Sequence, residues 1–229
     1  MDLITPRFPF EEMTKALGLR PYMNPEEYPV FWTVAQLVQG PILEVGTGNG
    51  FSALVFLTAT DKRHGGADNR VYTVDHYQGD THSDFKPTIE ATEQAIEKGI
   101  LRLGLNMTAI PTRFGLYAGE SATVAQQWKR KVDVLYIDGD HTYEGCKLDV
   151  MAWLPHLKVG GYLLLHDSRR NPDAPDPDRF DRGWQGPTQV AQELRRAHGV
   201  NPVHEAYSLT VWVKTRREPY VWGFEHDAP

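Results

Sequence analysis

Cysteine is almost absent from this chain. Among its 229 residues there is one cysteine, Cys146, so no disulfide can form within the chain. The disulfide-dense folds of small secreted domains are therefore excluded, and a reducing compartment is the simplest location. Cys146 lies within an apolar pattern of helical spacing, which favours a buried structural thiol over a nucleophile. We accordingly predict a cytoplasmic protein.

Long apolar runs and clustered basic residues are also missing. No segment approaches the ~20 consecutive apolar residues of a membrane-spanning helix, so we expect no membrane partner. The chain has 24 Lys and Arg against 30 Asp and Glu, a formal net charge of −6. Its basic residues are scattered, whereas a nucleic-acid surface normally shows a clustered basic face. We therefore expect no nucleic-acid partner.

The order of apolar segments predicts a single α/β domain with a helical N-terminal extension, residues 1–40. Prolines and an asparagine between residues 21 and 25 separate an early segment from a helix over 26–38. Strands and helices alternate from residue 41 onward, so 41–229 form the main domain. Such an alternation predicts a Rossmann-like, doubly wound, mostly parallel sheet with helices on both faces.

Seven strands and five helices are expected after residue 40. The strands are predicted at 42–45, 71–74, 107–111, 132–137 and 161–165, followed by an antiparallel terminal hairpin of 203–207 and 209–215. The helices are predicted at 51–58, 88–103, 121–130, 143–154 and 187–197. Residues 168–184 are rich in Asp, Arg and Pro, which predicts either a lid over a site or a solvated loop.

Polar side chains follow two apolar strands at the points where these strands end. They are Asp138, Asp140 and His141 after the strand at 132–137, and His166 and Asp167 after the strand at 161–165. Open α/β sheets bind their ligands at that edge. Carboxylates and imidazoles suit a divalent cation, and folding alone does not require so many of them there. The alternative is that these side chains cap the following helices.

A glycine-rich loop joins the first strand of the main domain to its helix. Residues 46–50 read Gly-Thr-Gly-Asn-Gly, a G-x-G-x-G spacing that differs from the G-x-G-x-x-G of a dinucleotide site. Glu44 precedes the loop, where an anion would repel a pyrophosphate but could accept from an amine. Asp75 ends the second strand, where a carboxylate can bind both ribose hydroxyls. This spacing ranks a nicotinamide oxidoreductase last among the functions considered.

With these motifs the chain resembles the class I S-adenosylmethionine-dependent methyltransferases. Residues 44–50 look like their first motif and Asp75 like their ribose-binding acid, over roughly residues 40–215. The resemblance implies a methyltransferase domain at 41–229 with S-adenosylmethionine as cofactor. The cofactor contacts that it implies lie after the first three strands: Glu44, Gly46, Thr47, Gly48, Gly50, Ser52, Asp75, His76, Gly119, Glu120 and Ser121. For Ser121, an N-cap role is the equal alternative.

Residues 137–145 and 160–167 are similar to the metal-dependent O-methyltransferases of sugars and antibiotic glycosides, and more distantly to catechol O-methyltransferase. The resemblance implies that Asp138, His166 and Asp167 bind a divalent metal. It also implies that His141 is the general base, with Asp140 as the competing base. The catechol enzyme has a carboxylate in place of His166. Since Mg²⁺ prefers oxygen donors, Mg²⁺ is the first expectation and Mn²⁺ the alternative.

Together these observations predict a metal-dependent O-methyltransferase that uses S-adenosylmethionine. A cation could bind neighbouring acceptor oxygens, and an imidazole can take a proton near neutral pH. The expected acceptor is a small hydroxylated molecule: a sugar, a glycoside or a catechol-like diol. A homo-oligomer is compatible with the sequence. A metal-dependent hydrolase is the alternative enzyme, but it leaves Asp75 and the glycine loop without a purpose. A non-catalytic S-adenosylmethionine-binding partner protein is disfavoured because metal donors and a base are present.

Overall fold

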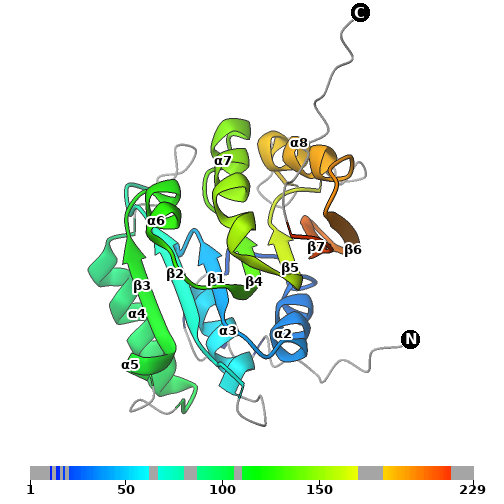
Figure 1. Ribbon diagram of the computed structural model, residues 1–229. Coiled ribbons are helices and arrows are strands. Elements are labelled where there is room, and N and C mark those ends of the chain that lie inside the picture. The colour runs from blue at the N-terminus through cyan, green and yellow to red at the C-terminus, as the bar shows by residue number, and fades with distance from the viewer. Residues whose placement is uncertain are drawn as a thin grey trace, which may run out of the picture.

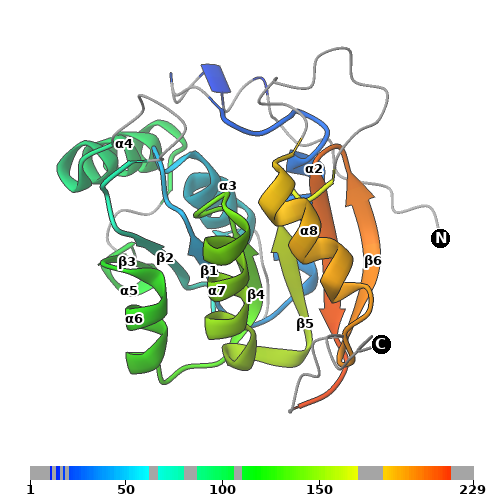
Figure 2. The ribbon, with the colours of Figure 1, turned by 90° about the horizontal axis from the view of Figure 1, so that it is seen from above.

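The computed structural model describes residues 11, 14–15, 18, 21–61, 67–79, 87–105, 110–169 and 183–217. Its strands are β1 (Ile42–Val45), β2 (Val71–Asp75), β3 (Phe114–Ala118), β4 (Val132–Ile137), β5 (Leu157–Leu165), β6 (Val200–Ala206) and β7 (Leu209–Lys214). They form one sheet in the order β3-β2-β1-β4-β5-β7-β6 (Figure 1). Strands β1 to β5 pair in parallel, whereas β7 runs antiparallel to β5 and β6 (Figure 2). The predicted Rossmann-like sheet with its terminal hairpin is confirmed.

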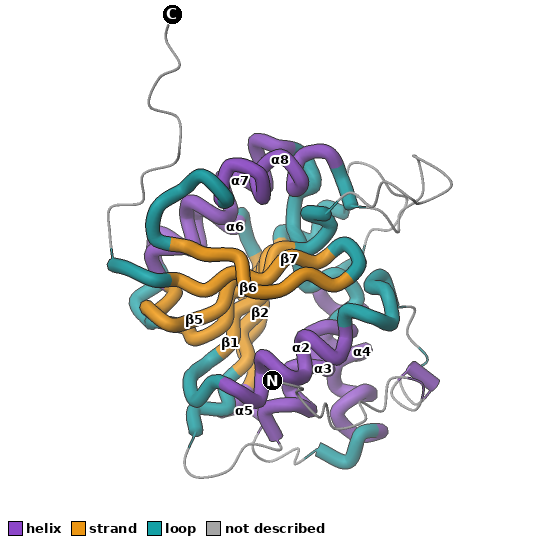
Figure 3. Tube along the Cα trace, turned by 90° about the vertical axis from the view of Figure 1, so that its right-hand side faces the viewer, coloured by secondary structure: helices purple, strands orange, loops and turns teal. Residues whose placement is uncertain are grey.

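Helices cover both faces of the sheet (Figure 3). One face carries α2 (Tyr28–Leu37), α3 (Phe51–Asp61), α4 (Ile89–Arg102) and the short α5 (Ile110–Arg113). The other carries α6 (Ser121–Gln127), α7 (Tyr143–Trp153), the 3-10 turn η1 (Leu154–His156) and α8 (Gln185–Leu194). Within the described ranges, no helix has both the length and the apolar character needed to span a membrane.

The sheet separates two apolar clusters, as expected where both faces are covered. On one side, side chains of α2, α3 and α4 pack on β1, β2, β4, β5 and β7. Helix α3 lies deepest there, because every one of its residues except Asp61 is buried. The rings of Phe31, Phe56 and Tyr136 join α2 and α3 to β4. The helix of the N-terminal region therefore belongs to the main core.

The third strand was predicted at the wrong place. Residues 107–109 lie outside the described residues, and Pro111 belongs to the short helix α5, since proline is well tolerated in a first helical turn. The strand itself is β3, at Phe114–Ala118. Its side chains are half-buried or exposed because β3 is an edge strand, although its sequence is apolar.

Several other boundaries differ from the prediction, most of all those of β5 and α8. Strand β5 begins at Leu157 and passes through Gly160 and Gly161, with a shift of register against β4. Helix α8 spans Gln185–Leu194, earlier than the predicted 187–197. Most of the predicted lid, residues 170–182, lies outside the described part of the chain.

Candidate active site

A cavity of about 310 Å³ opens at the carboxyl ends of the parallel strands. Its walls come from the loops after β1, β2, β3, β4 and β5, together with residues of the N-terminal region such as Tyr22 and Met23. Most of the predicted site residues line it: Gly46, Thr47, Gly48, Ser52, Asp75, His76, Gly119, Glu120, Ser121, Asp138, Asp140, His141, His166 and Asp167. Glu44 and Gly50 do not line it.

The glycine loop is fitted tightly between β2 and β4. Gly46 has a φ of 91°, and a Cβ at this position would lie 2.0 Å from the carbonyl oxygen of Asp138. Only glycine combines this backbone conformation with so close an approach. The Oδ2 atom of Asp75 accepts hydrogen bonds from the backbone N–H groups of Thr47 (2.9 Å) and Gly48 (3.1 Å). Asp75 therefore holds the loop as well as facing the cavity.

Glu44 lies one layer behind the cavity wall. It is 0% exposed, and its carboxylate accepts a hydrogen bond from the hydroxyl of Ser52, which does line the cavity. Burial raises the pKa of Glu44 well above its ordinary value. Gly50 supports the loop in a different way, because a Cβ there would lie 2.5 Å from the side chain of Ile96 on α4. Glu44 thus reaches a ligand most directly through Ser52.

The cavity extends along the loop after β3 toward α7. Glu120 occupies the N-cap position of α6, although its side chain makes no capping hydrogen bond, and Ser121 is the first residue of the helix. The N-cap alternative for Ser121 is therefore wrong. The hydroxyl of Ser121 instead accepts a hydrogen bond from Trp153 Nε1 at 2.8 Å. The buried carboxyl of Asp149 also lines this end, and burial raises its pKa to about 6. This carboxyl was not predicted from the sequence.

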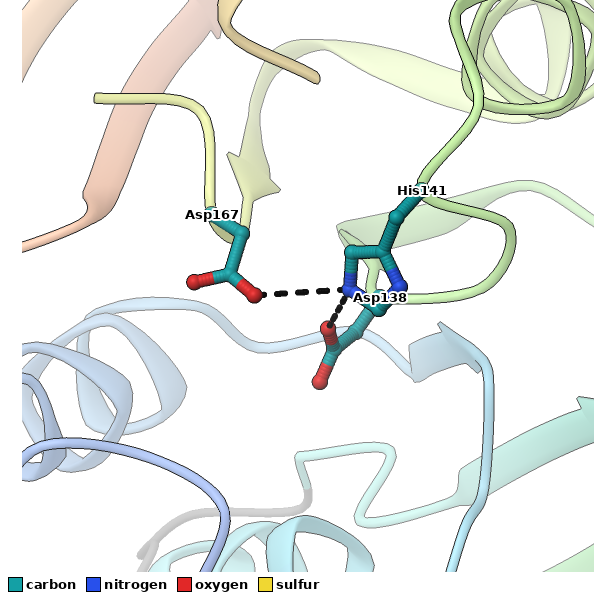
Figure 4. A group of neighbouring side chains, drawn as sticks. All are labelled: Asp138, His141 and Asp167. Atoms are coloured by element: carbon teal, nitrogen blue, oxygen red, sulfur yellow. Dashed lines mark ion pairs between the residues drawn. The ribbon is translucent and has the colours of Figure 1, made fainter. Parts of the chain in front are cut away.

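Asp138, His141 and Asp167 converge at the ends of β4 and β5 (Figure 4). His141 Nε2 lies 3.4 Å from Asp167 Oδ2 and 3.7 Å from Asp138 Oδ1. One donor atom from each of the three side chains lies within 4.8 Å of the others, which is close enough to share one metal ion. Asp167 has a φ of 49°, a strained conformation for a residue with a side chain. The predicted meeting of the two strand ends is confirmed.

His166 lies beside this group of three. Its Nδ1 lies 2.9 Å from Asp138 Oδ1 and 3.6 Å from Asp167 Oδ2, and its Nε2 lies 3.2 Å from Oε2 of Glu27. Both ring nitrogens therefore contact carboxylates. The coulombic effect of Asp138, Asp167 and Glu27 exceeds the opposing effect of burial and raises the pKa of His166 well above its ordinary value. The structure presents His141 rather than His166 to a metal shared with Asp138 and Asp167.

The surroundings of His141 and Asp140 separate the two candidate bases. Burial lowers the pKa of His141, but hydrogen bonds and charge from Asp138 and Asp167 outweigh it and raise the pKa to about 10. The ring of Trp184 packs against His141 with centroids 5.3 Å apart. Asp140 Oδ1 instead accepts from the backbone N–H of Thr142 (2.7 Å), the N-cap of α7. Asp140 thus holds the turn before α7, but it does not cap the helix: the side chain of Thr142 accepts from the backbone N–H of Gly145.

Comparison with known proteins decides the family. The family described as "Methyltransferase domain" matches residues 43–168, more than half of the chain. The chain belongs to this family. The resemblance to the class I S-adenosylmethionine-dependent methyltransferases is confirmed, and this domain is a methyltransferase of that class.

A curated protein and several solved structures are similar to this chain. The uncharacterised protein y4gI of Sinorhizobium fredii (strain NBRC 101917 / NGR234) is 29% identical over 139 residues, which are 60% of this chain and 14% of that protein. The chain thus spans a small part of this relative's length.

The methyltransferase PaMTH1 from Podospora anserina, solved with SAH, has a TM-score of 0.62 at 14% identity, over 92% of this chain and 89% of that one. CalS11, a TDP-rhamnose 3'-O-methyltransferase of calicheamicin biosynthesis, has a TM-score of 0.56 at 16% identity, over 89% of this chain and 92% of that one. At these identities the two structures establish a shared fold.

Proposed function

We propose that this methyltransferase transfers a methyl group from S-adenosylmethionine to a hydroxyl of a small acceptor, in the presence of a divalent cation. The observation that carries the proposal is the convergence of Asp138, His141 and Asp167 on the cavity that also contains the glycine loop and Asp75. The fold shared with a TDP-rhamnose methyltransferase favours a sugar or glycoside as acceptor. Because the only cysteine is buried, we also propose a cytoplasmic location.

The cofactor would lie along the loops after β1, β2 and β3. Asp75 faces the cavity beside the glycine loop, and its Oδ1, which accepts from the backbone N–H of Tyr77, retains one lone pair for a ribose hydroxyl. Gly119, Glu120 and Ser121 line the end where an adenine would fit, next to the buried Asp149. Ser52, backed by Glu44, lies on the opposite wall, where it would face the amino acid part of the cofactor.

The donor set at the ends of β4 and β5 fits a divalent cation. We assign Asp138 and Asp167 as its ligands, because they offer two carboxylates that face one point from separate strands. Oxygen donors favour Mg²⁺, while the nearby imidazole of His141 would also suit Mn²⁺. When bound, such a cation lowers the pKa of an acceptor hydroxyl and fixes its direction.

His141 would take the proton released by the acceptor. The S–CH₃ bond of the sulfonium breaks as the O–CH₃ bond forms, and the hydroxyl proton moves to the imidazole, leaving S-adenosylhomocysteine and the methyl ether. Without ligands, Asp138 and Asp167 keep His141 protonated at neutral pH, since its pKa is about 10. Its pKa would return toward the ordinary range once a cation balances the two carboxylates.

Transfer of radioactive label tests this function. The purified chain is incubated with methyl-labelled S-adenosylmethionine, Mg²⁺ or Mn²⁺, and a panel of sugars, glycosides and catechols. We expect label transfer to at least one acceptor, its loss on chelation and its return with metal. Asp167→Asn should lose transfer, while Glu97→Gln, which changes an exposed acid on α4, should keep it. Full activity after verified removal of metal would refute the cation dependence.

A further inference from the structure

A buried carboxylate of the N-terminal region reaches the active site. Glu27 is the residue immediately before α2, and it is 0% exposed. Its side chain does not cap the helix, although the N-cap position would allow this. The carboxylate instead contacts residues at the end of β5 and in the turn between β6 and β7. No sequence motif pointed to this residue.

Four groups surround the two oxygens of Glu27. Oε1 accepts hydrogen bonds from the backbone N–H (3.0 Å) and the hydroxyl (2.7 Å) of Ser208. Oε2 accepts from the backbone N–H of Asn24 (2.8 Å) and lies 3.2 Å from His166 Nε2. A buried carboxylate with this many donors is held in one orientation. Glu27 is therefore a fixed acceptor for the ring of His166.

The ring of His166 links Glu27 to Asp138, because its two nitrogens contact the two carboxylates. The Nδ1 atom of this ring lies 2.9 Å from Asp138 Oδ1, while the hydroxyl of Tyr136 donates to Asp138 Oδ2 at 2.6 Å. Asp138 is therefore held through both of its oxygens.

We propose that Glu27 is a positioning residue of the methyl-transfer site: through His166 it holds Asp138 in the orientation that faces Asp167 and His141. The inference rests on the cation site of the proposed function. Partners of metal ligands commonly act in this way, and changing them typically lowers metal affinity or activity roughly 10- to 100-fold.

A pair of neighbouring glutamates provides the test. Glu27→Gln keeps the size of the side chain but turns an amide N–H₂ toward one of the surrounding donors and removes the charge. Glu26→Gln makes the same change on the exposed preceding residue. Titration calorimetry with Mn²⁺ on the cofactor-free chain should show cation binding weakened roughly 10- to 100-fold in Glu27→Gln and unchanged in Glu26→Gln. Cofactor affinity should stay the same in both variants, because Glu27 does not line the active-site cavity.

A second measurement reads the ring of His166 directly and needs no metal. In ¹⁵N NMR spectra, the ring signals of His166 should shift in Glu27→Gln and stay in place in Glu26→Gln, because Glu27 contacts the ring. Unchanged signals in a folded Glu27→Gln would overturn the proposal. If Glu27→Gln fails to fold, Ser208→Ala, which removes a hydrogen bond to Glu27 Oε1, should shift these signals, and unchanged signals there would overturn it.

The two measurements separate this inference from the proposed function. Wild-type cation affinity in a folded Glu27→Gln would overturn the positioning role while leaving the cation site intact. If the wild type binds no cation, the cation site fails, and the His166 signals alone decide about Glu27. In that case, unchanged signals in Glu27→Gln would overturn the role, and shifted signals would support it.

Discussion

Asp75 Oδ2 lies 2.9 Å from the backbone nitrogen of Thr47, so the acid at the end of β2 anchors the loop at the end of β1. The same carboxylate faces the cavity in which we place the cofactor. Its two tasks are therefore coupled, since a change that removes the ligand contact also releases the loop.

We expect Asp75→Ala to weaken binding of S-adenosylmethionine and S-adenosylhomocysteine roughly 10- to 100-fold, because hydrogen bonds to a charged group are lost. Asp75→Asn retains one acceptor oxygen and should lie between this variant and the wild type. Calorimetry at fixed ionic strength gives the affinities. Equal affinities in all three proteins would show that Asp75 contributes nothing to cofactor binding.

The collision predicted at Gly46 can be measured against its neighbour. Gly46 and Gly48 both have positive φ, but only at Gly46 would a Cβ meet other atoms, those of Asp138 and Gly139. Gly48→Ala should cost about 1–2 kcal/mol for its left-handed conformation. Gly46→Ala should cost at least about 2 kcal/mol more, because the backbone after β4 must move. Urea unfolding of the two variants tests this difference, and equal midpoints would contradict it.

His141 and Asp140 make opposite predictions for the chemical step. His141→Ala should fold and bind cofactor, and its single-turnover rate should fall roughly 10²-fold or more, as expected for a lost general base. Asp140→Asn should keep most of the rate and of the stability, because the amide oxygen can still accept from the backbone N–H of Thr142. Rates measured from pH 5 to 9 with metal and cofactor at saturation distinguish them. A near-normal rate in His141→Ala would exclude it as the base.

The carboxyl of Asp149 should make stability depend on pH. Burial raises its pKa to about 6 from 3.8, so the unfolded chain loses this proton first as the pH rises. Below pH 4 the group is protonated in both states and has no effect, whereas between pH 4 and 6 it increasingly destabilises the folded protein.

Asp149→Asn removes this titration, so relative to the wild type its stability should rise across that range by on the order of 2–3 kcal/mol. Glu144→Gln, which changes an exposed acid on the same helix, should show no such trend. Denaturant unfolding of the cofactor-free proteins at pH 4, 5, 6 and 7 gives the comparison. Parallel curves for the wild type and Asp149→Asn would contradict the prediction.

The buried parallel strands were predictable because their apolar runs are continuous. Strands β1 and β4 are covered on both sides, so their sequences carry little except apolar residues and end sharply in polar ones. The same change from apolar to polar residues at a strand end identified Asp138 and Asp167 as candidate site residues. Strand β3, at Phe114–Ala118, is also an apolar run, but it is short, contains a glycine and follows a second run at 107–111, where the strand was predicted instead.

Side-chain direction was harder to predict than position. The sequence identified His141 and His166 as residues at strand ends but did not reveal that the ring of His166 would also contact Glu27. Glu27 precedes His166 by 139 residues. A contact of this kind arises only when α2 packs against the sheet, and no local pattern records it.

The burial of α3 determines how readily this part of the molecule unfolds locally. Helix α3 starts directly after the glycine loop and is buried along almost its whole length. Its amide hydrogens should therefore exchange with solvent only when the whole domain unfolds, whereas those of the exposed edge strand β6 should exchange through local fluctuations. The C-terminal end of the glycine loop is thus attached to the slowest-exchanging part of the protein, which keeps this wall of the cavity in place between catalytic cycles.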